Sequence, residues 1–435
     1  MSWISKLALV CIVFQIGLMG CDSTSTLEDP NSFYFLKFYG GDGDQTGDDL
    51  LVLSDGSFIL LGTTKASDAE KTSQWYLIKA DSKGKVVWEK KFGGPNNEEA
   101  RDVELTNDNR LVVVGNSYKG PTERDVLLMT FTLDGVKIDS TLVGLKTLSG
   151  VDTDEDALSV TQTSDGFIVA GSTTNTDLKP NQTVANDQRD AMHLRFTNNL
   201  KTYPNWSQTH GPGSIDVAVK VFPSGSPSFP FYLFGYTNKF GFSGQVRSDF
   251  NFWYFGLNDF GGNSGDFYAG DFIDDQKLGS VAVAPVQSGD GFFLGGITTN
   301  SAGAADIYMT RLRKSLVFNP TDYQFQKPLS INIGSNLPVK TCVFAAQQSG
   351  FYIMVNENSF SSNQNWLLTK INIDGSVNWS LPIVFGGEGI DTIGAIQELP
   401  DGRIVLLGTM TTGKPDVGES KMTLIKVNQD GKLLN

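Results

Sequence analysis

Short apolar runs recur along the chain, and most of them follow a turn that contains Asp and Gly. In residues 55–62, for example, the turn Asp55-Gly56 leads into an apolar run that ends at Gly62. The corresponding runs are about 58 residues apart and end at positions 62, 115, 171, 235, 296, 355 and 408. All seven end positions are Gly except position 355, which is Val. Seven copies at a nearly constant spacing indicate a repeat architecture.

A second pattern follows each run and consists of an alternating strand, a tight turn and another strand. Residues 75–88 and 365–379 show it best, with turns that contain Gly84 and Gly375. Tight hairpin turns need residues that tolerate positive φ, and Gly does so without steric cost. The strands are rich in Val, Ile, Phe and Tyr, and no long stretch has the helical period. Each repeat therefore predicts about four antiparallel strands, the content of one β-propeller blade.

The two ends of the repeat region complement one another. The seventh copy stops after residues 421–431 without a last strand, whereas an isolated strand-like segment, 35–41, opens the region. That segment resembles residues 88–94, which hold the last-strand position of the first copy. Pairing it with the seventh copy would cover two open sheet edges. We therefore expect an all-β fold over residues 32–435: one seven-bladed β-propeller of four-stranded antiparallel blades, the last closed by the N-terminal strand.

The repeat combines Trp, Gly-Gly, Asp-Gly and Lys-x-Asp-x-x-Gly elements, and it resembles propeller repeats common in exported proteins of the Bacteroidota, many of them lipoproteins. The resemblance implies a propeller in the cell envelope and names no activity. Residues 80–88 also resemble the tryptophan-docking repeat of pyrroloquinoline-quinone propellers. Only Trp88 and Trp379 occupy the docking position, and the adjacent cysteines and calcium site of those dehydrogenases are missing. We interpret both Trp residues as structural locks between blades.

Residues 1–20 have the pattern of an export signal. One cation precedes an apolar run, residues 7–19, that is too short to span a bilayer. Residues 18–21, Leu-Met-Gly-Cys, resemble the lipobox of bacterial lipoproteins, which implies cleavage before Cys21 and acylation of that residue. We therefore expect residues 21–31 to consist of the lipidated Cys21 and a polar tether. We expect a lipid-anchored protein of the cell envelope, in the outer membrane. The sequence does not decide between the periplasmic side and the surface side of that membrane.

Composition narrows the chemistry that the chain can perform. Its 48 acidic residues outnumber 34 Lys and Arg, a net charge of −14, which disfavours nucleic acid as a partner. The only histidines, His193 and His210, lie in no recognisable motif, and His193 falls in a strand-like stretch. A histidine-based zinc site or a Ser-His-Asp relay is therefore disfavoured. Cys342 lies in an apolar stretch, so we expect its small side chain to be buried.

Acidic clusters precede several of the repeats. In residues 41–49 carboxylates alternate with Gly, and Asp42, Asp44 and Asp48 are the candidate calcium ligands. An EF-hand loop would need Glu where Leu53 stands. We interpret the clusters as solvated loops, with calcium as the alternative, and expect no other cofactor. The sequence singles out no carboxylate pair for a glycosidase.

The most unusual stretch is residues 222–272, which hold 17 of the 48 aromatic residues. The aromatic residues of this stretch that alternate along a strand are expected to lie in the core of a blade. Those in loops with Asn and Asp are candidates to stack on a sugar or to dock a protein. The candidate binding surface comprises Phe250, Phe252, Trp253, Tyr254, Phe267 and Tyr268.

These observations favour a binding protein and single out no catalytic residue. The leading hypothesis is a non-catalytic, membrane-anchored propeller that binds another envelope or outer-membrane protein as a scaffold or accessory subunit. The alternative is a surface glycan-binding lipoprotein that uses the aromatic region 222–272. A glycan-active or quinone-dependent enzyme is the least favoured hypothesis.

Overall fold

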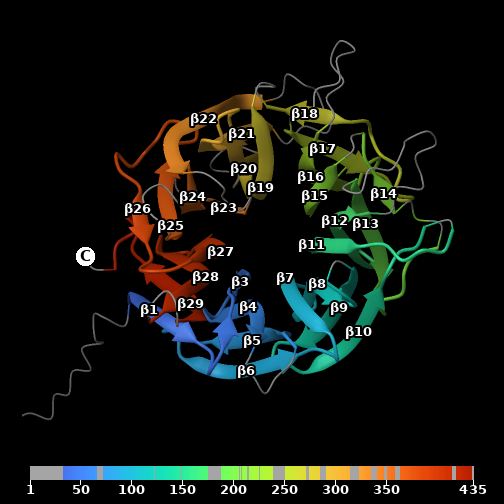
Figure 1. Ribbon diagram of the computed structural model, residues 1–435, viewed down its shortest axis with the longest axis horizontal. Coiled ribbons are helices and arrows are strands. Elements are labelled where there is room, and N and C mark those ends of the chain that lie inside the picture. The colour runs from blue at the N-terminus through green and yellow to red at the C-terminus, as the bar shows by residue number, and fades with distance from the viewer. Residues whose placement is uncertain are drawn as a thin grey trace, which may run out of the picture.

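Seven antiparallel sheets surround a central axis in the computed structural model of the chain (Figure 1). The structure describes residues 33–65, 72–121, 123–147, 149–174, 188–204, 206, 208–212, 215–224, 226–238, 250–270, 274–284, 291–313, 323–334, 340–346, 350–357, 363–413 and 418–433. These residues form 29 strands and no helix. None of the described segments is therefore a candidate membrane-spanning helix. The predicted all-β, seven-bladed propeller is confirmed.

Each blade is a meander whose first long strand lies nearest the axis and whose last strand lies on the outside (Figure 1). Blade 1 contains β2 (Asp44–Gln45), β3 (Asp49–Val52), β4 (Phe58–Lys65), β5 (Gln74–Ala80) and β6 (Val86–Phe92). Blade 2 contains β7 (Asn97–Leu105), β8 (Arg110–Tyr118), β9 (Arg124–Thr132) and β10 (Lys137–Val143). Blade 3 contains β11 (Glu155–Gln162), β12 (Gly166–Thr173), β13 (Asp190–Thr197) and β14 (Thr209–His210).

The second half of the ring repeats this order. Blade 4 contains β15 (Asp216–Pro223), β16 (Phe231–Thr237), β17 (Asn251–Leu257) and β18 (Phe267–Ala269). Blade 5 contains β19 (Asp275–Ala284), β20 (Gly291–Thr299), β21 (Ala305–Arg313) and β22 (Tyr323–Gly334). Blade 6 contains β23 (Thr341–Ala345), β24 (Phe351–Glu357), β25 (Asn365–Ile371) and β26 (Ile383–Phe385). Blade 7 contains β27 (Thr392–Glu398), β28 (Ile404–Thr412), β29 (Glu419–Val427) and β1 (Phe35–Tyr39).

Blade 7 joins the two ends of the chain, as the sequence predicts. Strand β1 pairs with β29 in antiparallel register, from Phe35 opposite Lys426 to Tyr39 opposite Met422. The Tyr39 hydroxyl also donates a 2.8 Å hydrogen bond to the carbonyl oxygen of Gly84 in blade 1. The N-terminal strand therefore completes the last blade and fixes it against the first. The predicted signal peptide, Cys21 and tether fall in residues 1–31, outside the described residues, so lipidation stays a prediction.

A close contact between the first two long strands of a blade explains the Gly that ends the apolar runs. A Cβ atom on Gly235 of β16 would lie 1.8 Å from the carbonyl oxygen of Val217 in β15. Beside this contact the inner strand bulges, because its pairing with β16 shifts register between Ala218 and Lys220. Blades 2, 3, 5 and 7 carry the same shift. Gly is required here because any side chain would occupy the space of the bulged strand.

Blade 6, whose apolar run ends in Val355, is the informative exception. Its inner strand pairs with β24 without a register shift, from Thr341 opposite Val355 to Ala345 opposite Phe351. Where Gly is replaced by Val, the inner strand is therefore regular. The blade that has Val in place of Gly is thus also the blade whose inner strand has no register shift at that position.

Large aromatic side chains lock neighbouring blades together at their outer hairpin turns. Trp88 of blade 1 packs on Gly135 in the turn of blade 2 and donates a 3.2 Å hydrogen bond from Nε1 to the carbonyl oxygen of Leu133. Trp379 of blade 6 packs on Gly431 of blade 7 in the same way. The structural role predicted for both Trp residues is confirmed. Phe325 and Phe35 hold the equivalent place against the turns of blades 6 and 1.

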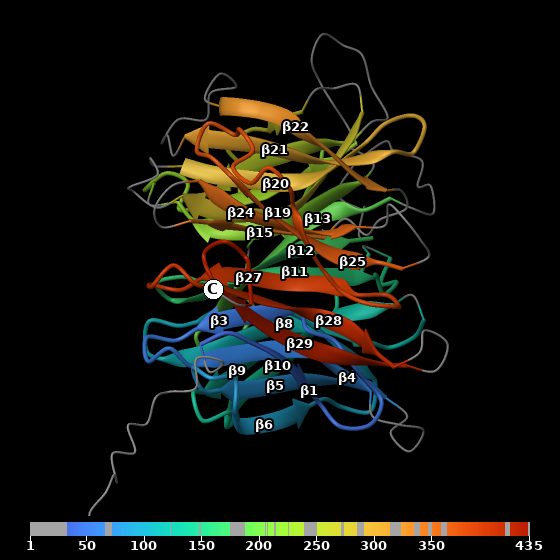
Figure 2. The same ribbon diagram turned by 90° about the vertical axis from the view of Figure 1, so that its left-hand side faces the viewer.

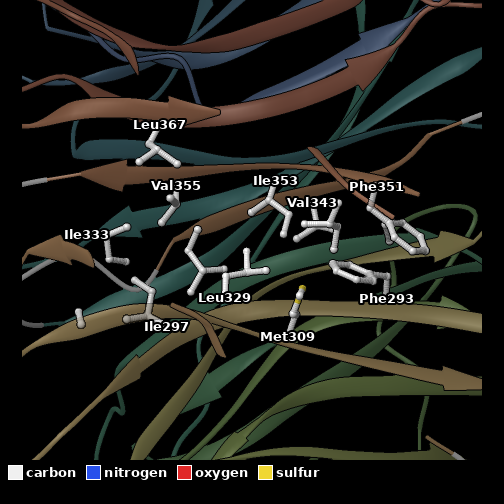
Figure 3. Packing of buried hydrophobic residues seen from close by; sticks show 14 residues of the cluster. Phe293, Ile297, Met309, Leu329, Ile333, Val343, Phe351, Ile353, Val355 and Leu367 are labelled. Atoms are coloured by element: carbon white, nitrogen blue, oxygen red, sulfur yellow. The ribbon is translucent and has the colours of Figure 1, made fainter. Parts of the chain in front are cut away.

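The hydrophobic core lies between the faces of adjacent blades. Between blades 5 and 6, Phe293 stacks on Phe351 with ring centroids 4.1 Å apart, Met309 and Ile353 lie beside the pair, and Leu367 lies at the other end of the same cluster (Figure 3). Equivalent clusters lie between other neighbouring blades. Seen from the side, the strands of neighbouring blades lie in successive layers (Figure 2). Burial of these side chains stabilises the closed ring without a disulfide among the described residues.

The contact between Gly235 and the inner strand leads to a first prediction. Replacing Gly235 with Ala forces a Cβ atom onto the Val217 carbonyl, so we expect a loss of about 2–3 kcal/mol in the free energy of unfolding. Gly120→Ala is the matched control, because nothing lies within 4 Å of its Cβ position. Urea unfolding followed by Trp fluorescence measures both variants. Equal midpoints for the two would contradict the proposed close contact.

Candidate functional site

A cavity of about 490 Å³ occupies the centre of the ring. Residues from the inner strands of all seven blades line it. The bulges of these strands contribute directly to its wall, because the residue that each register shift skips lies on the cavity in blades 2, 3, 4, 5 and 7: Arg101, Leu158, Val219, Gly279 and Gly394. Bulges re-aim side chains in this way next to functional sites in many proteins.

The cavity has two unlike walls. Blades 1 to 4 supply most of its charged side chains, including Asp49, Asp102 and Lys220. Blades 5 to 7 supply small or apolar residues, such as Val281 and Ile396, with Lys340 as the charged exception. A ligand with one polar and one apolar side therefore fits the cavity better than a ligand of either kind alone.

An ion pair crosses the polar part of the cavity. The Lys220 ammonium of blade 4 lies 2.8 and 2.9 Å from the two carboxylate oxygens of Asp102 in blade 2. Burial by itself would raise the pKa of Asp102, but the charge of Lys220 and several hydrogen bonds outweigh burial and lower it. Asp102 also accepts a 2.8 Å hydrogen bond from the backbone N–H of Val160 in blade 3. One carboxylate thus connects three blades.

Two further carboxyl groups surround this ion pair. Burial and the negative charge of Asp102 raise the pKa of Asp49, whose side chain also accepts a 2.9 Å hydrogen bond from the backbone N–H of Val103. Burial, again with the charge of Asp102, raises the pKa of Glu104 to about 7. Both groups therefore hold protons at a pH where exposed carboxyl groups are ionised.

A second charged cluster lies beside the first, around Arg101. One guanidinium nitrogen of Arg101 lies 3.1 Å from Glu99 and 3.4 Å from Asp156. Arg189, another cavity residue, pairs with Asp154 through the same guanidinium–carboxylate chemistry. The Nε–H of Arg101 differs from these groups, because it is buried and has no hydrogen-bond partner among the residues that the structure describes. A buried donor without an acceptor is costly unless a ligand supplies one.

Opposite pKa shifts in neighbouring carboxyl groups are typical of a catalytic acid and base, so the pair Asp49 and Asp102 requires a geometric test. The two side chains hydrogen-bond to each other directly. Glycosidase carboxyl groups lie about 5–9.5 Å apart, which leaves room for the sugar or a water molecule. In addition, Lys220 and a backbone N–H already occupy the oxygens of Asp102. This pair links inner strands and supplies no free base.

The aromatic binding surface predicted for residues 222–272 requires a correction. Phe252, Trp253 and Tyr254 lie in β17 with at most 2% of their surfaces exposed, packed in the core of blade 4 and against its neighbours. They alternate along a strand that is covered on both faces, so none of the three presents a ring to a ligand. Phe250, Phe267 and Tyr268 are half-buried and keep part of their surfaces accessible.

Of the candidate calcium ligands, Asp42 and Asp44 lie apart from the cavity, and Asp48 is on its wall. Asp44 accepts a 2.9 Å hydrogen bond from the backbone N–H of Ser420, and Asp48 accepts a 2.7 Å bond from the Thr46 hydroxyl. Within the described residues no group of three or more His, Cys, Asp or Glu side chains is placed to hold a metal ion. Asp42, Asp44 and Asp48 therefore do not converge on a common calcium position.

Cys342 and His193 lie where the sequence places them. Cys342 is buried, lines the cavity and donates its thiol to the carbonyl oxygen of Gly394, and burial raises the pKa of the thiol to about 12. His193 is fully buried in β13, and burial lowers the pKa of its imidazole to about 3. The thiol is therefore un-ionised and the imidazole neutral at pH 7. Neither provides a nucleophile or a proton shuttle at the cavity.

Ionisation in the cavity leads to a second prediction. Because the pKa values of Asp49 and Glu104 are raised in the folded protein, each group takes up a proton on folding above about pH 4, and its contribution to stability falls as pH rises from there toward the raised value. Asp49→Asn keeps the shape of a protonated carboxyl group and cannot ionise. We expect the free energy of unfolding of Asp49→Asn to increase relative to that of the wild type as the pH rises from 5 to 8.

Urea unfolding at pH 5, 6.5 and 8 measures this difference. Glu104→Gln is the companion variant, with a gain in the same direction because the pKa of Glu104 is raised to about 7. Parallel stability profiles for wild type and Asp49→Asn would contradict a proton held on Asp49.

No protein-family model and no curated protein match the chain. Solved structures that resemble it include an α-L-arabinofuranosidase from Fusarium graminearum, with a TM-score of 0.46, 10% identity, and coverage of 91% of this chain and 95% of that chain. A lectin from Burkholderia pseudomallei has a TM-score of 0.48 at 12% identity, covering 91% and 98% of the two chains. Drosophila semaphorin 1a has a TM-score of 0.48 at 9% identity, covering 91% and 88%. Resemblance at this level assigns the chain to no functional class.

Proposed function

We propose that the protein is a non-catalytic, membrane-anchored propeller that binds another protein of the bacterial envelope, as a scaffold or accessory subunit. The partner would engage the axial cavity. The observation that carries the proposal is Arg101 on the cavity wall, whose buried Nε–H donor has no acceptor among the described residues. A group from outside the chain would satisfy that donor.

The surroundings of Arg101 favour a neutral acceptor. Glu99 and Asp156 already compensate the guanidinium charge, so an additional carboxylate would meet two like charges. A main-chain carbonyl oxygen accepts the Nε–H without that repulsion. The opposite wall, with Val281 and Ile396, would contact an apolar side chain of the same segment. A short segment of polypeptide combines these two features, which supports a protein partner.

The charges elsewhere in the cavity support a rigid binding platform. Asp102 connects blades 2, 3 and 4 through its bonds to Val160 and Lys220, and Asp49 connects blades 1 and 2. Because these groups bond to one another, the inner strands are held before a partner arrives. A binding surface that is already ordered loses less conformational entropy on association.

Glycan binding remains the second candidate function, and the structure changes its basis. Three of the six aromatic residues on which it depended are buried in blade 4, which leaves Phe250, Phe267 and Tyr268 to stack on a sugar. Sugar hydroxyl groups would also accept from Arg101. No specific observation favours a sugar over a peptide in the cavity.

Isolation of the native lipoprotein from mildly solubilised membranes, with mass spectrometry of the proteins that co-purify, tests the proposal. We expect one partner in stoichiometric amount with the wild-type protein and a reduction of at least tenfold with Arg101→Gln. Arg403→Gln is the matched control, because Arg403 is a similarly exposed arginine paired with Asp401 away from the cavity. Thermal unfolding confirms that both variants are folded.

Two results would count against the proposal. If the wild-type protein is isolated alone, the scaffold function loses its support, and glycan arrays become the next test. If Arg101→Gln retains the partner in full, the partner binds elsewhere on the propeller.

A further inference from the structure

Among the described residues, exposed apolar side chains are concentrated on one side of the ring. Strand β1 exposes Leu36 and Phe38 by 39% and 50%, and Val86 and Val87 at the start of β6 are exposed by 40% and 59%. Strands β10 and β26, on either side, expose further apolar residues, Ile138, Leu142 and Val384. In the described parts of the outer strands β14, β18 and β22, across the ring, no large hydrophobic residue is exposed.

Strand β1 and the turn before β6 are in contact, so the two outer strands lie next to each other on the rim. Tyr39 of β1 donates a hydrogen bond to Gly84 in the turn before β6, and the ring of Phe35 packs on the same Gly84. Figure 1 shows the two strands as neighbours on the outside of blades 7 and 1. We call the surface formed by residues 35–39 and 81–92 the outer wall.

The outer wall is basic in an acidic protein. It carries Lys at five positions, 37, 83, 85, 90 and 91, against acidic residues at positions 81 and 89, whereas the whole chain has a net charge of −14. Exposed apolar residues among lysines are the combination that binds an anionic lipid surface, because the apolar groups enter the interface while the ammonium groups pair with headgroups.

The position of the predicted anchor adds a second argument. This argument rests on the proposed attachment of the protein to the membrane. Thirteen residues, 22–34, separate Cys21 from the first residue of β1. Thirteen residues span at most about 45 Å when fully extended. An acyl group on Cys21 would therefore hold β1, at the centre of the outer wall, within that distance of the bilayer.

We propose that the outer wall lies on the surface of an anionic membrane. The propeller then stands on its rim, with the axis of the ring parallel to the bilayer, because β1 and β6 lie on the rim in both views (Figures 1 and 2). Both ends of the ring axis face the aqueous phase in this orientation. A partner anchored in the same membrane reaches the cavity from the side.

Vesicle sedimentation with a chain that begins at Asp22 tests the inference. This chain lacks Cys21 and contains every strand of the closed ring. We expect it to bind vesicles that contain phosphatidylglycerol at least tenfold more tightly than vesicles of phosphatidylcholine alone, with the difference lost at high salt. Equal binding to both, or none to either, would overturn the inference.

Two variants of the outer wall separate its apolar and basic contributions. Phe38→Ser with Val87→Ser removes exposed apolar groups, and Lys37→Glu with Lys85→Glu reverses two charges. We expect each pair to weaken binding to the anionic vesicles at least fivefold, with thermal unfolding unchanged. Phe260→Ser is the control, because Phe260 is 76% exposed and lies in the turn between β17 and β18, outside the outer wall. Binding that tolerates both pairs would exclude the outer wall as the contact surface.

The outcomes also separate this inference from the proposed function. A mature protein without acyl chains by mass spectrometry would contradict the anchor and leave the vesicle result independent. If the outer-wall variants lose the co-purifying partner and keep vesicle binding, the outer wall is a protein interface and the membrane inference is wrong.

Discussion

The architecture depends on the close approach of the inner strand to the Gly residue of the next strand. That approach leaves no space for a Cβ atom at Gly171 or Gly235, and it accompanies a bulge in the inner strand. The bulge turns one additional residue toward the axis, which is how Arg101 and Leu158 reach the cavity. A packing constraint within single blades therefore determines which side chains line the centre of the ring.

In the charged half of the cavity, side chains whose burial would otherwise be costly form ion pairs and hydrogen bonds between blades. Asp102 alone bonds to Lys220 of blade 4 and to the backbone of Val160 in blade 3. Because those oxygens are occupied, the group stabilises the ring and is unavailable as a catalytic base. The donor left over, the Nε–H of Arg101, is the one group of this cluster that we assign to a ligand.

Local patterns in the sequence predicted the fold almost completely. Asp-Gly turns, alternating strands and the isolated segment 35–41 are each readable within a few residues, and they define the blades and the closure of the ring. The cavity could not be predicted in this way. Lys220 and Asp102 are 118 positions apart and meet only across the closed ring. One signal was present, since Lys220 interrupts the otherwise apolar run Val217 to Phe222 of β15.

The aromatic region was misjudged for a related reason. An alternating strand predicts one buried face and one exposed face, but both faces of β17 are covered, because a middle strand of a blade lies between two neighbouring blades. Phe252, Trp253 and Tyr254 are consequently all buried. The sequence pattern identified the strand, and its position in the ring determined the exposure of its side chains.

The central claim is that a partner occupies the axial cavity of an already rigid ring. Hydrogen–deuterium exchange of the purified complex, compared with the free protein, tests it most directly. The account predicts strong protection of the inner strands in the free protein, and additional protection on binding around β7, β11 and the segment near Arg189. Additional protection confined to other surfaces, with the cavity strands unchanged, would contradict it.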